Sequence, residues 1–303
     1  MSNKSENINL KISTENETAE ASFLMKRIFL EDVISDNVTI TGKDARHLAY
    51  SLRAKKGDRI VAVDKAGNTA VIELTTFSNE SIGAKCVSKI TKVNPETVQI
   101  MNEESDAAEI YTKRITLAEC LPKQNKFDAV VEKATELGVD RIEPLISDRT
   151  IARPGTFRAK SKLERWARVA KEAAVQCARD TLPEIGEIRE LSDWLKDISK
   201  TLGIFRSTDK NGAKKFDGKG AILIFCYENE QEVPLQKILR EYKLCDCDKN
   251  IILLIGPEGG FTEREVREIK SYGGVSVSLG KRILKTDTAA ISALASVQYE
   301  FSY

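Results

Sequence analysis

The sequence predicts an α/β protein, in which a mostly parallel sheet covered by helices follows a small β-barrel domain. Three observations predict this fold. After residue 113, apolar strand-like segments alternate with amphipathic helical ones, as in a parallel sheet. Before residue 93, short strands follow one another with close turns, which is typical of a small barrel. At residues 251–255 a continuous apolar run leads into a glycine-rich turn, which indicates a strand buried on both faces.

The barrel domain is expected at residues 23–92. Strands are predicted at residues 27–30, 38–40, 59–64, 70–75 and 82–90, and one short helix is predicted at 44–53. Gly57-Asp58 and Gly67-Asn68 mark turns between strands. Residues 1–22 are polar and acidic and are expected to form a disordered tail, and residues 93–113 are expected to form a linker.

The second domain is expected at residues 114–303. Its strands are predicted at residues 115–120, 141–146, 203–205, 221–226, 251–255 and 275–279. A helix is predicted over 126–137, because Phe127, Val130 and Ala134 share one face and Gly138 follows as a stop. A second helix is predicted over 158–177.

The loop after residue 255 reads Gly256-Pro257-Glu258-Gly259-Gly260, so the backbone turns sharply and can lie close to a ligand. Thr262 and Glu265 have the spacing of a capping box, which predicts a helix that stops at Gly273-Gly274. The loop lacks the features of a P-loop and of a dinucleotide fingerprint. It suits an adenosine-like or methionine-like ligand better than a triphosphate. A tight strand-to-helix connection without a ligand is the alternative interpretation.

A second glycine-containing loop follows the strand predicted at 275–279. Thr286 or Asp287 is predicted to cap the helix that comes next. This helix is apolar on nearly all sides, so it is expected to pack against the sheet or a second subunit. Two strand-to-loop junctions this close in sequence can wall one pocket, which predicts a ligand site beyond the carboxyl ends of the strands.

Composition limits the other possibilities. The 303 residues are enough for two domains, and the net charge of +1 means that any RNA binding must depend on local basic patches. No apolar run approaches the roughly 18 residues of a membrane-spanning helix, and no secretion signal is present, so a cytoplasmic protein is expected. The six cysteines are expected to be free thiols. Cys245 and Cys247 form the one close pair and His47 is the single histidine, so no metal site is predicted.

Several motifs in order carry a family resemblance. The pattern GPEGGF-T-x-x-E at residues 256–265 is followed by LGxRILxTxTA at 279–289. Further matches lie at 123–128, 132–139, 147–149 and 176–185, and in the first domain at His47-Leu48, Leu52-Arg53 and Gly57-Asp58. With these motifs the chain resembles the RsmE family of SPOUT-class RNA methyltransferases over roughly residues 26 to 303.

The resemblance implies a PUA-like RNA-binding domain at 23–92 and a trefoil-knotted SPOUT methyltransferase domain at 114–303. It also implies a homodimer, with S-adenosylmethionine bound near the subunit interface. The implied reaction is methylation of N3 of a specific uridine in 16S ribosomal RNA, within the small ribosomal subunit. Two alternatives stay open: another SPOUT enzyme that methylates a ribose or a different base, and a catalytically silent RNA-binding assembly factor.

The resemblance also implies roles for individual residues. The cofactor-binding residues are expected to be Leu254, Ile255, Gly256, Pro257, Glu258, Gly259, Gly260, Leu279, Gly280, Ile283, Leu284, Thr286, Thr288 and Ala289. Arg179 and Gln176 are the expected catalytic residues, placed near the target base or the cofactor. RNA contacts are expected from Arg27, His47, Arg53, Lys123, Arg149 and Arg153. Basic residues gather in two clusters, at 46–59 and 149–168, which favours RNA binding. No residue is assigned as the general base.

Four positions depart from the family pattern. Val175 replaces an acid and Ala178 replaces a glycine in the motif that contains Gln176. In the second loop, Lys285 replaces an arginine and Asp287 replaces a glutamate. Lysine lacks the bidentate fork of arginine, so these departures bear on the mechanism more than on cofactor binding.

Overall fold

The computed structural model describes residues 26–78, 80–88, 91–92, 114–123, 126–201, 221–243 and 250–301. The expected tail at 1–22, the linker at 93–113 and the strand at 203–205 lie outside the described residues. The chain divides into two compact units, residues 1–93 and 94–303, and each is described by itself.

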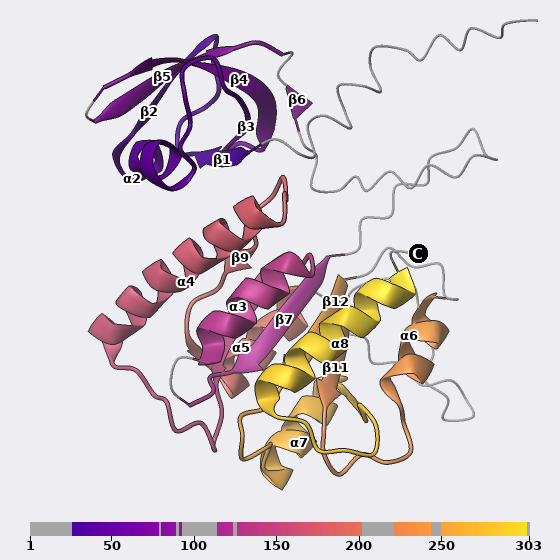
Figure 1. Cartoon of the computed structure of the whole chain (residues 1–303). Coiled ribbons are helices and arrows are strands. Elements are labelled where there is room, and N and C mark those ends of the chain that lie inside the picture. The colour runs from indigo at the N-terminus through magenta and orange to yellow at the C-terminus, as the bar shows by residue number, and fades with distance from the viewer. Residues whose placement is uncertain are drawn as a thin grey trace, which may run out of the picture. The chain divides into compact units, whose positions relative to one another are not determined.

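The first unit is a curled six-stranded sheet around its own core (Figure 1). The strands are β1 Arg27–Leu30, β2 Asn37–Thr41, β3 Arg59–Asp64, β4 Asn68–Phe77, β5 Ser81–Cys86 and β6 Thr91–Lys92. Their order is β1-β3-β4-β5-β2, with β6 on β4, and β1 and β3 are parallel while the other pairs are antiparallel. The predicted barrel-like domain is therefore present.

The predicted helix at 44–53 differs in form. It begins earlier, as α2 Gly42–Arg46, and continues as a π-helical turn, η1 His47–Ser51. Leu48 is fully buried and fixes this segment against the sheet. Arg53 has a φ of 49°, in the left-handed region, so the helix cannot extend to it.

The second unit contains a seven-stranded sheet in which every described pairing is parallel. The strands are β7 Ile115–Cys120, β8 Arg141–Ile146, β9 Glu184–Ile185, β10 Arg189–Glu190, β11 Ala221–Cys226, β12 Asn250–Ile255 and β13 Val275–Val277. Their order is β10-β8-β7-β12-β11-β13, with β9 on β8. The expected strand 275–279 is shorter, because β13 ends at Val277 and Ser278 makes only an isolated bridge to Pro234.

The strand order reverses between β7 and β12. From β7 the chain moves outward to β8 and β10, and it then builds β11, β12 and β13 on the other side of β7. Such a reversal leaves a crevice at the carboxyl ends of the two central strands, where open α/β sheets bind their ligands. Residues Ile255 of β12 and Glu119 of β7 lie opposite each other at this end.

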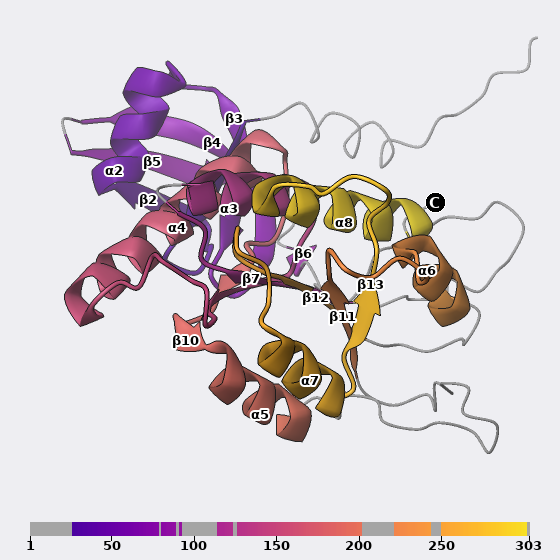
Figure 2. The same ribbon diagram turned by 90° about the horizontal axis from the view of Figure 1, so that it is seen from below.

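Helices cover both faces of the parallel sheet (Figure 2). They are α3 Lys126–Glu136, α4 Thr156–Gln176, α5 Leu191–Thr201, α6 Leu235–Lys243, α7 Glu263–Ser271 and α8 Thr286–Phe301. One face packs on α3, α4, α6 and α8, and the other packs on α5 and α7. The apolar residues that predicted α3 are buried, among them Phe127 and Val130, which confirms that helix.

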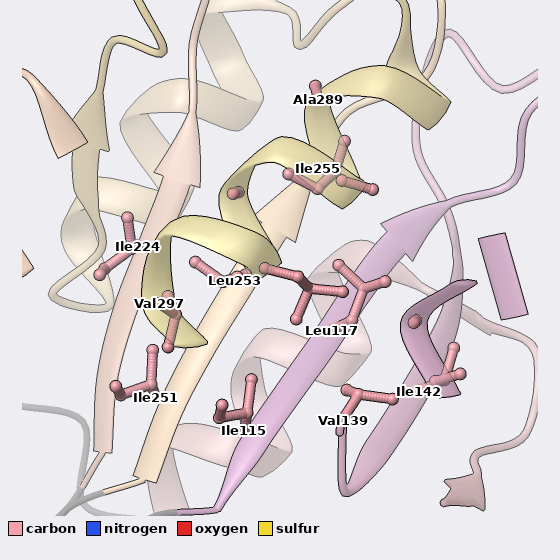
Figure 3. Close-up of a cluster of buried hydrophobic side chains, with 14 of the residues drawn as sticks. Ile115, Leu117, Val139, Ile142, Ile224, Ile251, Leu253, Ile255, Ala289 and Val297 are labelled. Carbon is pink, nitrogen blue, oxygen red and sulfur yellow. The ribbon is translucent and has the colours of Figure 1, made fainter. Parts of the chain in front are cut away.

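The C-terminal helix α8 lies across β12 and β7 (Figure 3). Ala290 and Ala293 are completely buried, and their small side chains let the helix approach the strands closely. Tyr299 is exposed, so the helix is buried on one side rather than all round. Within the described residues, none of the helices combines the length and the apolar character needed to cross a membrane.

Candidate functional site

The first glycine loop begins where β12 ends. The backbone N–H of Gly260 donates to the carbonyl oxygen of Pro257 at 2.8 Å, which closes a tight turn. Gly260 has a φ of 66°, a conformation that residues with a side chain rarely adopt. Phe261 is buried and packs edge-on to Phe225, which fixes the end of the loop to the sheet. The loop is therefore rigidly placed over the carboxyl edge.

Two neighbouring segments hold this loop in place. Glu258 accepts a hydrogen bond from the backbone N–H of Lys123 at 3.0 Å, and Nζ of Lys126 lies 3.6 Å from the same carboxylate. On the other side, Arg149 donates to the carbonyl oxygen of Gly259 at 2.6 Å. The segments that follow β7 and β8 thus bracket the loop that follows β12.

The predicted capping box is confirmed. The Thr262 side chain accepts from the N–H of Glu265, and the Glu265 carboxylate accepts from the N–H of Thr262 at 2.8 Å. Glu265 is buried and also accepts from the N–H of Asp148 at 2.7 Å. Arg264 donates to Asp148 at 2.6 Å, and this hydrogen bond is the main cause of the lowered pKa of the Asp148 carboxyl. The network joins α7 to the loop after β8.

The second loop is joined to the first by one hydrogen bond. The hydroxyl of Thr286 donates to the carbonyl oxygen of Gly256 at 2.5 Å. The predicted cap at Thr286 is therefore wrong, because α8 begins at this residue and its hydroxyl points to the other loop. Gly280 has a φ of 118°, and its N–H donates to the Ser278 hydroxyl at 3.2 Å.

A buried acid lies at the carboxyl edge, on β7, next to the strand β12 that leads into the first loop. Glu119 is completely buried, and neither of its carboxylate oxygens has a hydrogen-bond partner in the described structure. Burial, and then the negative charges of Asp287 and Glu258, raise the pKa of this carboxyl well above its ordinary value. Burial and these two neighbouring charges therefore favour the neutral form of Glu119.

The expected cofactor residues gather around this edge. Leu254, Ile255 and Pro257 are buried, and Leu279 and Leu284 are half-buried against the core on the α8 side. Ile283 is 86% exposed, and Gly280, Thr288, Glu258 and Gly259 are also exposed, whereas Ala289 is buried. These residues therefore combine an apolar wall with open backbone and polar groups on both loops.

The two expected catalytic residues lie elsewhere in the chain. Arg179 donates to the carbonyl oxygens of Thr135 and Val139, both at 2.9 Å, at the beginning of β8. This is the amino-terminal edge of the sheet, opposite to the glycine loops of the same chain. Burial lowers the pKa of the Arg179 guanidinium. Gln176 is exposed at the end of α4. The structure does not bring these residues to the glycine loops within one chain.

The expected RNA contacts divide into surface and buried positions. His47, Arg53, Lys123, Arg149 and Arg153 are exposed. Arg149 is held by Gly259, and Arg153 donates to the carbonyl oxygen of Ser147 and pairs with Glu190. Arg27 is buried in β1, with an exposed fraction of 7%. Arg27 therefore does not present its guanidinium as a surface contact, in disagreement with the expectation.

The sequence did not lead to a prediction of the buried Glu119 or of the hydrogen-bond network that joins α7 to the loop after β8. Glu119 carried a weak signal, since it is the one charged residue in the apolar strand 115–120. The link from Asp148 to Glu265 carried no signal, because the two residues are 117 positions apart. As to metals, the described residues contain no group of three or more His, Cys, Asp or Glu side chains that could hold an ion, and Cys245 and Cys247 lie outside these residues.

Comparison with known proteins places the chain. A family model described as an RNA methyltransferase domain matches residues 109–298, and one described as an RNA methyltransferase PUA domain matches residues 40–85. The chain belongs to the RNA methyltransferase family. The first match covers the whole parallel sheet and both glycine loops, and the second covers most of the curled sheet of the first unit.

Relatives in this RNA methyltransferase family match along nearly the full length. A ribosomal RNA small subunit methyltransferase E from Bacillus subtilis is 28% identical over 284 residues, which is 91% of this chain and 97% of the relative. The Synechocystis protein of the same name is 29% identical over 93% of this chain and 80% of the relative. The resemblance to the RsmE family is therefore confirmed.

Solved structures agree with the fold. A ribosomal RNA small subunit methyltransferase E from Neisseria gonorrhoeae, bound to S-adenosyl methionine, has a TM-score of 0.70 at 25% identity and covers 91% of this chain and 98% of its own. A putative methyltransferase from Legionella pneumophila has a TM-score of 0.66 at 22% identity, covering 91% and 97%. Because its identity is this low, the Legionella pneumophila structure supports the fold alone.

Proposed function

We propose that this protein transfers a methyl group from S-adenosylmethionine to N3 of a uridine in the 16S RNA of the small ribosomal subunit. One observation carries the proposal: the two glycine loops are joined by Thr286 and Gly256 beside the reversal of strand order. Membership of the RNA methyltransferase family and the names of the relatives support it. The Neisseria gonorrhoeae structure supports the choice of cofactor.

The residues at the two loops fit this cofactor. Leu254 to Gly260 and Leu279 to Ala289 would hold it, with apolar side chains for the adenine ring and open backbone groups for its polar atoms. Glu258, Asp287 and the buried Glu119 disfavour a phosphate ligand and favour a cation. When bound, the cofactor supplies an electrophilic methyl group on a positively charged sulfur.

The protein's own contribution is to place the reactants and to exclude water. Each wall of the site is tied to another segment, so the site is formed before the reactants arrive, which lowers the entropic cost of bringing them together. Uracil N3 lies on the Watson–Crick edge, so the target base must be unpaired or turned out of its helix. Its N3–H proton must leave during the reaction, and we assign no residue as the base.

Exposed cations on this unit and on the PUA-like unit are proposed to position the RNA through its phosphates. Arg149 lies next to the first glycine loop through its contact with Gly259, and Arg153 is held by Ser147 on the segment that follows β8. His47 and Arg53 lie on the surface of the first unit. A homodimer and a knotted C-terminal chain are part of the proposal.

The deciding experiment uses labelled S-adenosylmethionine with small ribosomal subunits that lack the modification, followed by digestion of the RNA to nucleosides. Labelled N3-methyluridine is the expected product. A different labelled nucleoside would contradict the target but retain the cofactor, as expected for another SPOUT enzyme. Absence of both label and cofactor binding would contradict the enzyme proposal and favour a silent RNA-binding factor. A Thr286→Ala variant serves as the weakened-site control.

A further inference from the structure

The side chain of Glu119 requires a physical explanation. It lies on the same face of β7 as Leu117, towards the core beneath α8, and its exposed fraction is 0%. Both carboxylate oxygens are buried without a hydrogen-bond partner among the described residues. Burying an unpaired carboxyl group is costly compared with an apolar side chain of the same size. Neighbouring positions of the strand are apolar, so the acid is an exception within its own element.

The charged groups that face Glu119 come from two elements. Asp287 lies in the first turn of α8, and Glu258 lies in the loop after β12. Lys126 of α3 is paired with Glu258 at 3.6 Å, so its charge is directed to that carboxylate. On the adjacent strands, Ile255 and Pro144 occupy the paired positions and carry no charge. Among the residues that the structure describes, Glu119 therefore has like charges nearby and no cation of its own.

The location of Glu119 relates it to the proposed ligand. It lies on one of the two strands that flank the reversal of strand order, and the paired position on the other strand is Ile255, directly before Gly256. Glu258 belongs to the first loop, and Asp287 lies in the first turn of α8, directly after the second loop. A positively charged group held between these loops would meet three acids and would favour the charged form of a buried carboxyl.

We propose that Glu119 is the charge-balancing group for a cationic ligand between the two glycine loops, losing a proton to solvent when S-adenosylmethionine binds. This inference rests on the function proposed above. No bond to the ligand forms: the proton leaves the neutral carboxyl, and the carboxylate then offsets the positive charge of the sulfonium. Glu119 therefore acts on the ligand through its charge, as a positioning residue. Without the ligand, burial and the two neighbouring acids keep its pKa raised and the carboxyl neutral.

Calorimetric titration with two ligands tests the proposal. S-adenosylmethionine and S-adenosylhomocysteine share the adenosine and the amino acid but differ in the charge on sulfur. Titrations at pH 7 in two buffers of different ionisation enthalpy give the number of protons released. We expect about one more proton to be released with S-adenosylmethionine than with S-adenosylhomocysteine, because the sulfonium alone drives the ionisation.

Two variants separate this role from a structural one. Glu119→Gln keeps the shape but cannot ionise, so the extra proton should vanish and S-adenosylmethionine affinity should fall roughly tenfold, with S-adenosylhomocysteine affinity unchanged. Glu143→Gln is the matched control, because Glu143 is also a buried acid of this sheet, on β8, and its carboxylate pairs with Arg141. The Glu143→Gln variant should release the same extra proton as the wild type when S-adenosylmethionine binds.

A measurement on the wild type alone covers the case of a variant that fails to fold. The ratio of the two affinities should change in favour of S-adenosylmethionine as the pH rises, by up to about tenfold per unit while Glu119 is protonated in the free protein. A pH-independent ratio, or equal proton release with both ligands, would overturn the role of Glu119. Failure of either ligand to bind would overturn the proposed cofactor as well, so the two failures are distinguishable.

Discussion

Thr286 and Gly256 join the two glycine loops through a single hydrogen bond of 2.5 Å, from the threonine hydroxyl to the glycine carbonyl oxygen. Thr286 is buried and begins α8, whereas Gly256 directly follows β12, so the bond couples the C-terminal helix to the end of the central strand. The proposed cofactor site depends on this coupling, because each loop forms one wall.

The first prediction concerns this bond. Thr286→Ala leaves the Gly256 carbonyl without its partner, and we expect S-adenosylmethionine affinity to fall roughly tenfold. Isothermal calorimetry measures the change. Thr286→Ser retains the hydroxyl and should bind within a few-fold of wild type, while Ser296→Ala removes a comparable hydroxyl later in α8. Equal affinities for all four proteins would show that the bond does not shape the site.

The second prediction concerns Glu265. Its buried carboxylate accepts from the N–H groups of Thr262 and Asp148, so Glu265→Ala removes part of the capping box and leaves two partly buried donors without this partner. We expect the free energy of unfolding to fall by about 2 to 4 kcal/mol, as measured by urea denaturation. Glu263→Ala, two residues earlier in the same turn and exposed, should change it by less than about 0.5 kcal/mol. Equal losses in the two variants would refute the anchoring role.

The third prediction is a pH dependence of the ligand-free protein. The ordinary pKa of a glutamate is 4.5, and that of Glu119 is raised well above it in the folded state. Between these values the folded protein keeps a proton that the unfolded chain has released, so the free energy of unfolding falls as the pH rises. The contribution of Glu119 to this slope reaches about 1.4 kcal/mol per pH unit.

Urea denaturation of wild type and Glu119→Gln at several pH values measures this contribution. The variant should lose the slope, so its stability relative to wild type should increase from pH 5 upward. Glu143→Gln should retain it. If the difference between wild type and Glu119→Gln stays constant with pH, the carboxyl does not keep its proton in the folded protein.

The fourth prediction concerns Arg179. Its guanidinium donates to the carbonyl oxygens of Thr135 and Val139, between the end of α3 and the beginning of β8. Arg179→Ala should therefore lower the free energy of unfolding by about 2 to 3 kcal/mol, with S-adenosylmethionine affinity unchanged. Denaturation and calorimetry measure the two effects. A variant that stays fully stable but loses methyl transfer would assign Arg179 to the chemistry instead.

The fifth prediction concerns Ala178, which replaces the glycine of the family motif. It has a φ of 59°, and the N–H of Arg179 donates back to the carbonyl oxygen of Ala174, which is the geometry of a Schellman cap. Ala178→Gly should stabilise the protein by about 0.5 to 1 kcal/mol, since the left-handed conformation is strained for alanine. Ala167→Gly, on the exposed side of α4, should destabilise it by a similar amount. If both substitutions stabilise the protein, the effect at position 178 does not come from the left-handed backbone conformation.

Local patterns in the sequence were enough for much of the fold. The apolar run of residues 251–255 predicted β12, the spacing of Thr262 and Glu265 predicted the capping box, and the shared face of Phe127 and Val130 predicted α3. Each of these features depends on residues within a few positions of one another, so the chain carries the information locally. The boundaries were less accurate where tertiary contacts act, as in the short β13 and the π-helical turn after α2.

By itself the sequence determined the α/β class, the two glycine loops and, through its motifs, the family. Only the tertiary structure decided what surrounds those loops. The contact of Lys123 with Glu258 spans 135 positions, and the pairing of Glu119 with Ile255 exists because β7 and β12 are neighbours in the sheet. Strand order is a property of the whole chain, so no local pattern could place a buried acid beside one loop or Arg179 at the opposite edge.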